Sequence, residues 1–82
     1  MRVIVYTKSG CHLCDHLLED LAWVRTQVGF DVELRDISTD PVAEERFRYL
    51  VPVVEVGGAL VYPPHDALRL LNRLTEAAHK EP

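Results

Sequence analysis

Two cysteines separated by two residues, Cys11 and Cys14, are the side chains of this sequence best suited to carry out chemistry. A disulfide between them would close too short a loop to restrict the unfolded chain much, so a purely structural bond explains the pair poorly. The pair therefore indicates either thiol–disulfide exchange or metal binding. The 82-residue chain contains no other cysteine, which confines both hypotheses to this one segment.

The position of Cys11 favours the redox hypothesis. Val3–Tyr6 is a continuous β-prone run, typical of a central strand that is buried on both faces. A helix is predicted from Cys11 to about Val28, and the free N–H groups and dipole at a helix start favour negative charge. In such settings the pKa of a cysteine thiol falls from about 8.5 to roughly 3.5–7.5. We therefore predict that Cys11 is the attacking thiolate and that Cys14, one helical turn later, is the resolving thiol.

Two further side chains flank the predicted nucleophile. Lys8 can add positive potential or bind a substrate carboxylate, but an ordinary solvated loop lysine is a competing interpretation. His12 can stabilise a thiolate when it is protonated, and here the competing interpretation is an exposed histidine with little effect.

Metal binding by the same segment is the main alternative. Asp15 and His16 lie near the cysteines, but a structural zinc site usually has four ligands from two separated pairs. His65 would have to complete the set from far along the sequence, so we predict no metal site. A soft-metal carrier, in which the two thiolates bind copper(I) or zinc, remains as the second hypothesis.

The rest of the chain supplies three more strands. Asp31–Ile37 alternates apolar and polar residues, which predicts a strand at an edge of the sheet. Pro52–Val56 and Ala59–Tyr62 are predicted to form a hairpin through Gly57–Gly58.

Two more helices are predicted. Ser38–Pro41 combines capping residues with a proline and so predicts the start of a short helix. A last helix is expected from His65 or Asp66 to Ala78, followed by a frayed tail at 79–82. The residues expected to face the core are Leu13, Leu17, Leu21, Val24 and Val28 in the first helix, Ala43, Phe47 and Leu50 in the second, and Leu68, Leu71, Leu74 and Ala78 in the third.

These elements follow one another in the order βαβαββα. A helix joins the first two strands, which should therefore be parallel, with a right-handed crossover. The last two strands should be antiparallel. The prediction is a single α/β domain over residues 1–82, with a mixed four-stranded sheet and helices on both faces.

Composition and charge exclude several classes of function. The formal net charge is −4 and no basic cluster is present, so no nucleic-acid partner is expected. No apolar run approaches the ~20 residues that span a bilayer, and the apolar residues before Lys8 are too few for a signal peptide. We therefore expect a cytoplasmic protein without a membrane partner, and a monomer as the default for this size.

The segment Tyr6–Cys14, the pair Val51–Pro52 and the last helix resemble the glutaredoxin family of the thioredoxin fold, over nearly the whole chain. The resemblance implies a thiol–disulfide oxidoreductase that reduces protein or small-molecule disulfides through its CxxC pair. It also implies a cis Val51–Pro52 bond facing the cysteines, with the Val51 backbone pairing with a bound peptide or glutathione. The base rate for X–Pro bonds alone predicts the trans form.

The resemblance also bears on glutathione. Lys8 matches the position that contacts the glycyl carboxylate of glutathione, and Asp66 matches the acid that meets its amino group, although Asp66 by itself indicates a helix cap. Pro63–Pro64 replaces the family's Gly-Gly, and proline offers no N–H and adds bulk. We therefore expect no tightly bound cofactor, with glutathione or thioredoxin reductase as electron donor and a disulfide-containing protein or small thiol as partner. Glutathione-bridged iron–sulfur binding is a further alternative, which Pro63–Pro64 disfavours.

Overall fold

The computed structural model describes residues 1–80, which form a sheet of four strands in the order β2-β1-β3-β4. The strands are β1 (Arg2–Thr7), β2 (Asp31–Asp36), β3 (Val53–Val56) and β4 (Ala59–Val61). β1 pairs in parallel with β2 and antiparallel with β3, and β4 pairs antiparallel with β3. The predicted parallel pair, late hairpin and edge position of the second strand are thus confirmed.

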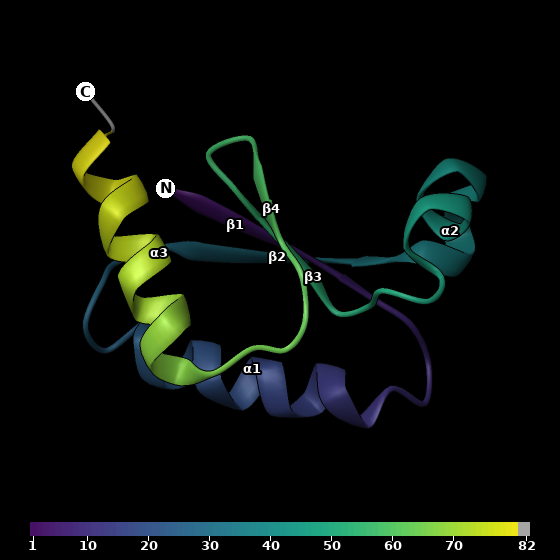
Figure 1. The fold of residues 1–82 in the computed structure, drawn as a ribbon, viewed down its shortest axis with the longest axis horizontal. Helices are drawn as coiled ribbons and strands as arrows, with labels where there is room; N and C mark the ends of the chain where they lie inside the picture. Colours follow the sequence, from purple (N-terminus) through teal and green to yellow (C-terminus); the bar gives the residue numbers. More distant parts are fainter. Residues whose placement is uncertain (81–82) are drawn as a thin grey trace.

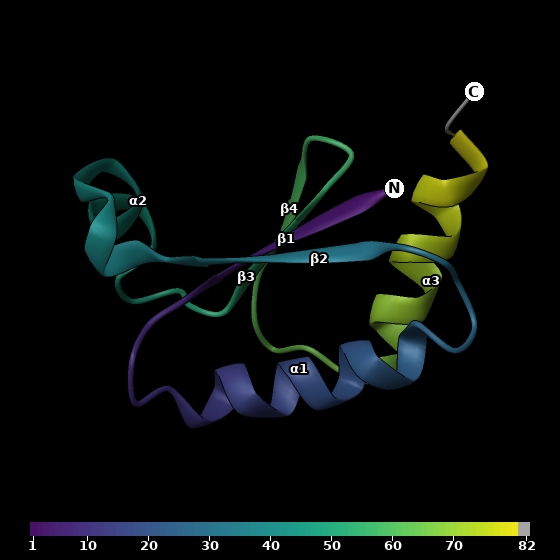
Figure 2. The ribbon, with the colours of Figure 1, turned by 180° about the vertical axis from the view of Figure 1, so that it is seen from behind.

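Three helices pack around this sheet. α1 (His12–Val24) and α3 (Ala67–Lys80) lie below the sheet and beside its left end in Figure 1, whereas α2 (Pro41–Phe47) lies at the opposite end. A short 3-10 turn, η1 (Ile37–Thr39), leads into α2. Figure 2 shows the same arrangement from behind, with the segment between β4 and α3 running down towards α1 before α3 begins. No helix within residues 1–80 is long and apolar enough to cross a membrane.

The two faces of the sheet carry separate apolar clusters, which confirms that helices cover both faces. The larger cluster joins α1 and α3 to one face and includes Val5, Leu17, Leu21, Leu70 and Leu74. The smaller cluster joins η1 and α2 to the other face and consists of Ile37, Ala43, Phe47 and Val53, with Tyr6 packed against it. As predicted, β1 is buried on both sides, because Val3, Ile4 and Val5 are all at most 8% exposed.

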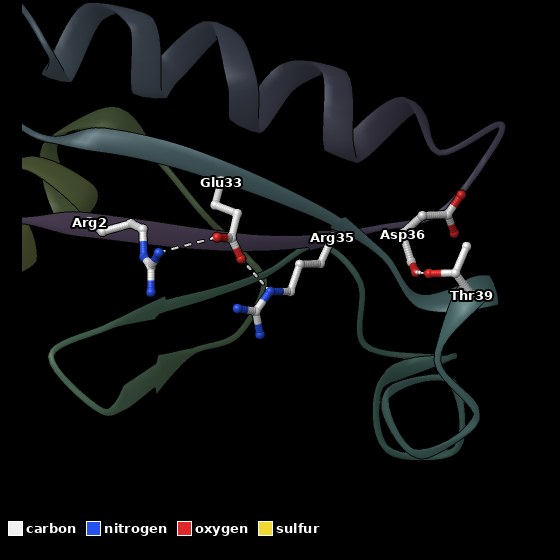
Figure 3. Close-up of polar contacts among 5 residues, drawn as sticks. All are labelled: Arg2, Glu33, Arg35, Asp36 and Thr39. Atoms are coloured by element: carbon white, nitrogen blue, oxygen red, sulfur yellow. Dashed lines mark hydrogen bonds and ion pairs between the residues drawn. The ribbon is translucent and has the colours of Figure 1, made fainter.

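The edge strand β2 is covered with charged side chains. Glu33 pairs with Arg2, at 3.4 Å, and with Arg35, and Asp36 at the strand end accepts a hydrogen bond from Thr39 through its carbonyl oxygen (Figure 3). Charged side chains on an exposed edge disfavour pairing with the strands of other molecules. The alternating acidic and basic side chains thus explain why β2 can remain an edge strand, with no further strand paired to its outer side among the described residues.

The first helix differs from the prediction in its register and its end. Leu13 is 62% exposed, and Cys14 takes the inward position in that turn, so the buried stripe starts one residue later than expected. α1 also ends at Val24 and not near Val28. The 14–17–21–24 spacing keeps one face towards the sheet, which places Leu13 beside that face.

The other helices also correct the prediction. In α3 the buried residues are Leu70 and Leu74, whereas Leu68, expected to face the core, is 67% exposed. Leu50 is 42% exposed because it follows the end of α2 at Phe47. α3 continues to Lys80, beyond its predicted end at Ala78, and residues 81–82 of the predicted frayed tail lie outside the described part of the chain.

Candidate active site

The two cysteines lie at the start of α1 and are joined by a disulfide, with their Cα atoms 5.3 Å apart. Cys11 is the N-cap residue of the helix, and its sulfur accepts a hydrogen bond from the backbone N–H of Cys14, at 3.2 Å. Cys11 is partly exposed, whereas Cys14 is 4% exposed. Only Cys11 therefore offers its sulfur to a molecule arriving from solution.

The loop before Cys11 places Lys8 and His12 beside the disulfide. Gly10 has a φ of +76°, a conformation that favours glycine and turns the chain from β1 into α1. Lys8 and His12 are exposed and line, together with both cysteines, a cavity of about 280 Å³. The structure thus brings these four predicted site residues together.

A second cation lies close to Lys8. Arg48, the C-cap residue of α2, lines a cavity of about 260 Å³ with Lys8, Ser38 and the acidic Glu44. The β1–α1 loop and α2 lie at the same end of the sheet in Figure 1, which explains how residues so far apart in sequence line one cavity. Arg48 is absent from the residues predicted for the site, because nothing in its own sequence neighbourhood points to the cysteines.

The Val51–Pro52 peptide bond is cis, as the resemblance implied and against the base-rate expectation for Pro52. Pro52 is fully buried directly before β3. The backbone N–H of Val51 donates to the carbonyl oxygen of Phe47, at 3.1 Å, so it is already used inside the protein. Within residues 1–80 no hydrogen bond reaches the Val51 carbonyl oxygen, which leaves that oxygen as the free acceptor of this residue.

A larger cavity, of about 380 Å³, connects the cysteine segment with the cis proline. Its walls include Leu13 and Leu17 of α1, Pro52, and the segment Pro63, Pro64 and His65. The Pro63–Pro64 bond is also cis. These side chains are mostly apolar, and proline adds no backbone donor to the wall.

His65 links the two proline segments. Its Nε2 lies 2.8 Å from the carbonyl oxygen of Pro52, and because a carbonyl can only accept, Nε2 carries the proton. The Nδ1 of His65 is buried and has no hydrogen-bond partner in the described structure. From the sequence, His65 is a candidate helix start or a remote zinc ligand, because its contact with Pro52 spans thirteen residues and leaves no local signal.

Asp66 acts as a helix cap in this structure. Its carboxylate accepts a hydrogen bond from the backbone N–H of Arg69, at 2.8 Å, in the first turn of α3. The guanidinium of Arg69 donates to the carbonyl oxygen of Pro64, at 2.9 Å. Asp66 lines neither the cavity of the two cysteines nor the larger cavity that contains Pro52. It therefore stands apart from the rest of the predicted site.

The acidic and histidine side chains around the cysteines do not converge. Among residues 1–80, no group of three or more His, Cys, Asp or Glu side chains is arranged to hold a metal ion. His16 instead lies 3.9 Å from Glu19, one turn along the exposed side of α1.

Comparison with known proteins agrees with this geometry. The family model described as glutaredoxin-like domain (DUF836) matches residues 2–76. An X-ray structure of the structural genomics target protein XcR50 from X. campestris is 32% identical, covers 90% of this chain and 96% of its own, and has a TM-score of 0.77. The solution structure of XcR50 gives a TM-score of 0.74 over 93% of this chain and 95% of that one, also at 32% identity.

A solved structure of lower sequence identity shows which fold the chain has. Thioredoxin 1 from the thermophilic eubacterium Thermosipho africanus is 17% identical and has a TM-score of 0.67 over 98% of this chain and 100% of its own. The fold is therefore the thioredoxin fold. No curated protein matches the sequence. Because the family model covers all the elements that build the cysteine site, the chain belongs to the glutaredoxin-like domain family (DUF836).

Proposed function

We propose that this protein is a thiol–disulfide oxidoreductase that reduces protein or small-molecule disulfides through Cys11 and Cys14. The observation that carries the proposal is the N-cap position of Cys11, whose partly exposed sulfur accepts the backbone N–H of Cys14 at 3.2 Å. A hydrogen bond and a helix N-terminus both favour a negatively charged sulfur over a thiol. The thiolate is the nucleophilic form of cysteine.

The reaction proceeds in two exchanges. The Cys11 thiolate attacks one sulfur of the substrate disulfide, the substrate S–S bond breaks, and the released substrate thiolate takes a proton from solvent. Cys14 then gives up its proton and attacks the Cys11 sulfur of the mixed disulfide. The second substrate thiol leaves, and the protein holds the Cys11–Cys14 disulfide, having transferred two electrons to the substrate.

The residues around the cysteines support substrate binding. Lys8 and His12 line the cavity of the two cysteines, and Lys8 also lines a second cavity with Arg48, so positive charge is available to a substrate carboxylate on this side of the site. The free carbonyl oxygen of Val51, held beside the cis Pro52, can accept a backbone N–H from a bound peptide. The electron donor that regenerates the dithiol is glutathione or thioredoxin with its reductase, and we expect a monomeric, cytoplasmic protein without a tightly bound cofactor.

A redox titration tests the proposal. The oxidised protein is equilibrated with glutathione buffers, and separately with thioredoxin and thioredoxin reductase, and its thiols are then trapped by alkylation and counted. We expect the pair to equilibrate with at least one of these systems. A pair that stays inert in both, in a folded protein that binds copper(I) tightly, would contradict the proposal in favour of the soft-metal carrier.

Two variants separate the roles of the cysteines. Cys11→Ser should lose disulfide reduction entirely, because no other thiolate is exposed at the site. Cys14→Ser should still attack and should accumulate a mixed disulfide on Cys11, visible by mass spectrometry. Full activity in either variant would contradict the assigned mechanism.

A further inference from the structure

The cavity of about 380 Å³ beside the cysteines has the chemistry of an apolar subsite. Leu13 lies between the two cysteines in the sequence and is 62% exposed at the edge of this cavity. The cis Pro63–Pro64 segment also lines this cavity, and so does Pro52 of the cis Val51–Pro52 bond. A volume of this size falls at the lower end of pockets that take ligands, about 300–1,000 Å³.

The side chains that line the cavity disfavour an anionic group. No lysine or arginine lines it, and its charged lining residue is Asp20, with His16 and His65 as the remaining polar side chains. Glutathione carries a carboxylate at each end. Lys8 and Arg48 can receive one of these carboxylates. No lysine or arginine lines the apolar cavity to receive the other carboxylate, and Pro63 and Pro64 have no backbone N–H to donate to it.

The backbone beside the cavity favours a peptide. The Val51 carbonyl oxygen has no hydrogen bond within residues 1–80, so it can accept an N–H from an extended chain that passes Pro52. Tyr49 and Leu50, which directly precede Val51, are 88% and 42% exposed. A small apolar molecule would fill the cavity but leave this acceptor unused.

We propose that this cavity is a specificity subsite that takes an apolar side chain, such as leucine, located next to the reacting cysteine of a polypeptide disulfide. The inference rests on the proposed function, since it names the substrate class of the same site. Binding the side chain between Leu13 and Pro63–Pro64 would place the neighbouring disulfide at Cys11. The Cys11–Cys14 dithiol then reduces that disulfide to two thiols and becomes oxidised itself, and an external dithiol or glutathione restores it.

The test compares two peptide substrates. Each contains one cysteine joined by a disulfide to 2-mercaptoethanol, and the residues on both sides of the cysteine are leucines in one peptide and serines in the other. For the reduced wild-type protein we expect kcat/KM to be about tenfold or more higher for the leucine peptide, which corresponds to about 1.4 kcal/mol. A ratio near one would overturn the inference.

Two matched variants locate the subsite. Leu13→Ser removes an exposed leucine from the cavity wall, and Leu68→Ser removes a leucine that is 67% exposed on α3 and lies outside the cavity. The preference for leucine should fall towards one in Leu13→Ser and stay at the wild-type value in Leu68→Ser. Equal preferences in the two variants would overturn the assignment. The readout is the ratio of two substrates, so a change in thiol reactivity at Leu13→Ser cancels.

Further arms separate this inference from the proposed function. A glutathione mixed disulfide should react more slowly than the leucine peptide, and a faster reaction would overturn the subsite. Bis(2-hydroxyethyl) disulfide has no side chain for the cavity and reports the exchange chemistry alone. Reduction of this small disulfide without a leucine preference would overturn only the subsite, whereas no reduction of any disulfide would overturn the proposed function.

Discussion

The register of α3 can be tested with two leucines that lie two residues apart. Leu70 is fully buried in the cluster that joins α1 and α3 to the sheet, whereas Leu68 is 67% exposed. Replacing a buried leucine with alanine typically lowers the free energy of unfolding by about 2–5 kcal/mol, through lost burial and the cavity that remains. For Leu70→Ala we expect about 3 kcal/mol, because the site lies between two helices and the sheet.

That loss would be a large part of the total stability. A domain of this length is stabilised by about 4–12 kcal/mol, at about 0.05–0.15 kcal/mol per residue. The corresponding fall in Tm is about 12–24 °C, from about 4–8 °C per kcal/mol in small domains. Leu68→Ala should change the free energy of unfolding by about 0.5 kcal/mol or less, as for other exposed sites.

The assay is urea unfolding followed by circular dichroism, with the disulfide state kept the same in all three proteins. The difference between the two variants is the informative quantity, because both change leucine to alanine in the same helix. Equal losses of stability, or a larger loss for Leu68→Ala, would refute the buried face assigned to α3 and restore the stripe predicted from the sequence.

Three other substitutions give smaller, distinct effects. Asp66→Ala should lower the free energy of unfolding by about 1 kcal/mol in urea titrations, because it removes the cap on Arg69 N–H, and it should leave the rate of reduction by glutathione nearly unchanged. Hydrogen bonds from the hydroxyl and backbone N–H of Ser38 hold the pKa of Asp36 below its ordinary value of 3.8, so this carboxylate stabilises the fold above that pH and its contribution is lost as the pH falls through the lowered pKa. The stability advantage of wild type over Asp36→Asn should therefore be larger at pH 7 than at pH 2. Glu33→Gln should lower the free energy of unfolding by about 1 kcal/mol or less, with the difference shrinking in 1 M salt, as for exposed ion pairs.

Local signals made much of the fold predictable. The side chain of Asp40 caps α2, and Pro41 occupies the first turn of that helix. Both effects act within three residues of their own position, so local sequence is enough to predict them. Gly57 and Gly58 both have positive φ values, which a two-residue hairpin turn requires. Such features depend on the chain's own stereochemistry, so the sequence contains the information needed to place them.

The buried faces of the helices were harder to predict, for a reason visible in α3. The segment contains Leu68, Leu70, Leu71 and Leu74, which supply two different helical stripes of similar apolar character. Only packing against α1 and the sheet decides that Leu70 and Leu74 face inward. Leu13 posed the same problem, since Cys14 is small and apolar enough to take the inward position in its place.

Within the site, the chemistry and the specificity have different origins. Cys11 and Cys14 are three residues apart at the start of one helix, so their placement follows from local sequence and was predictable. The walls that would choose a substrate come from distant segments: His65 contacts Pro52, and Arg48 reaches the cavity of Lys8. The segment Pro63–Pro64 therefore bears on which molecules can enter the larger cavity, whereas the placement of the cysteines depends on the start of α1. The substrate is therefore harder to predict from the sequence than the position of the cysteines.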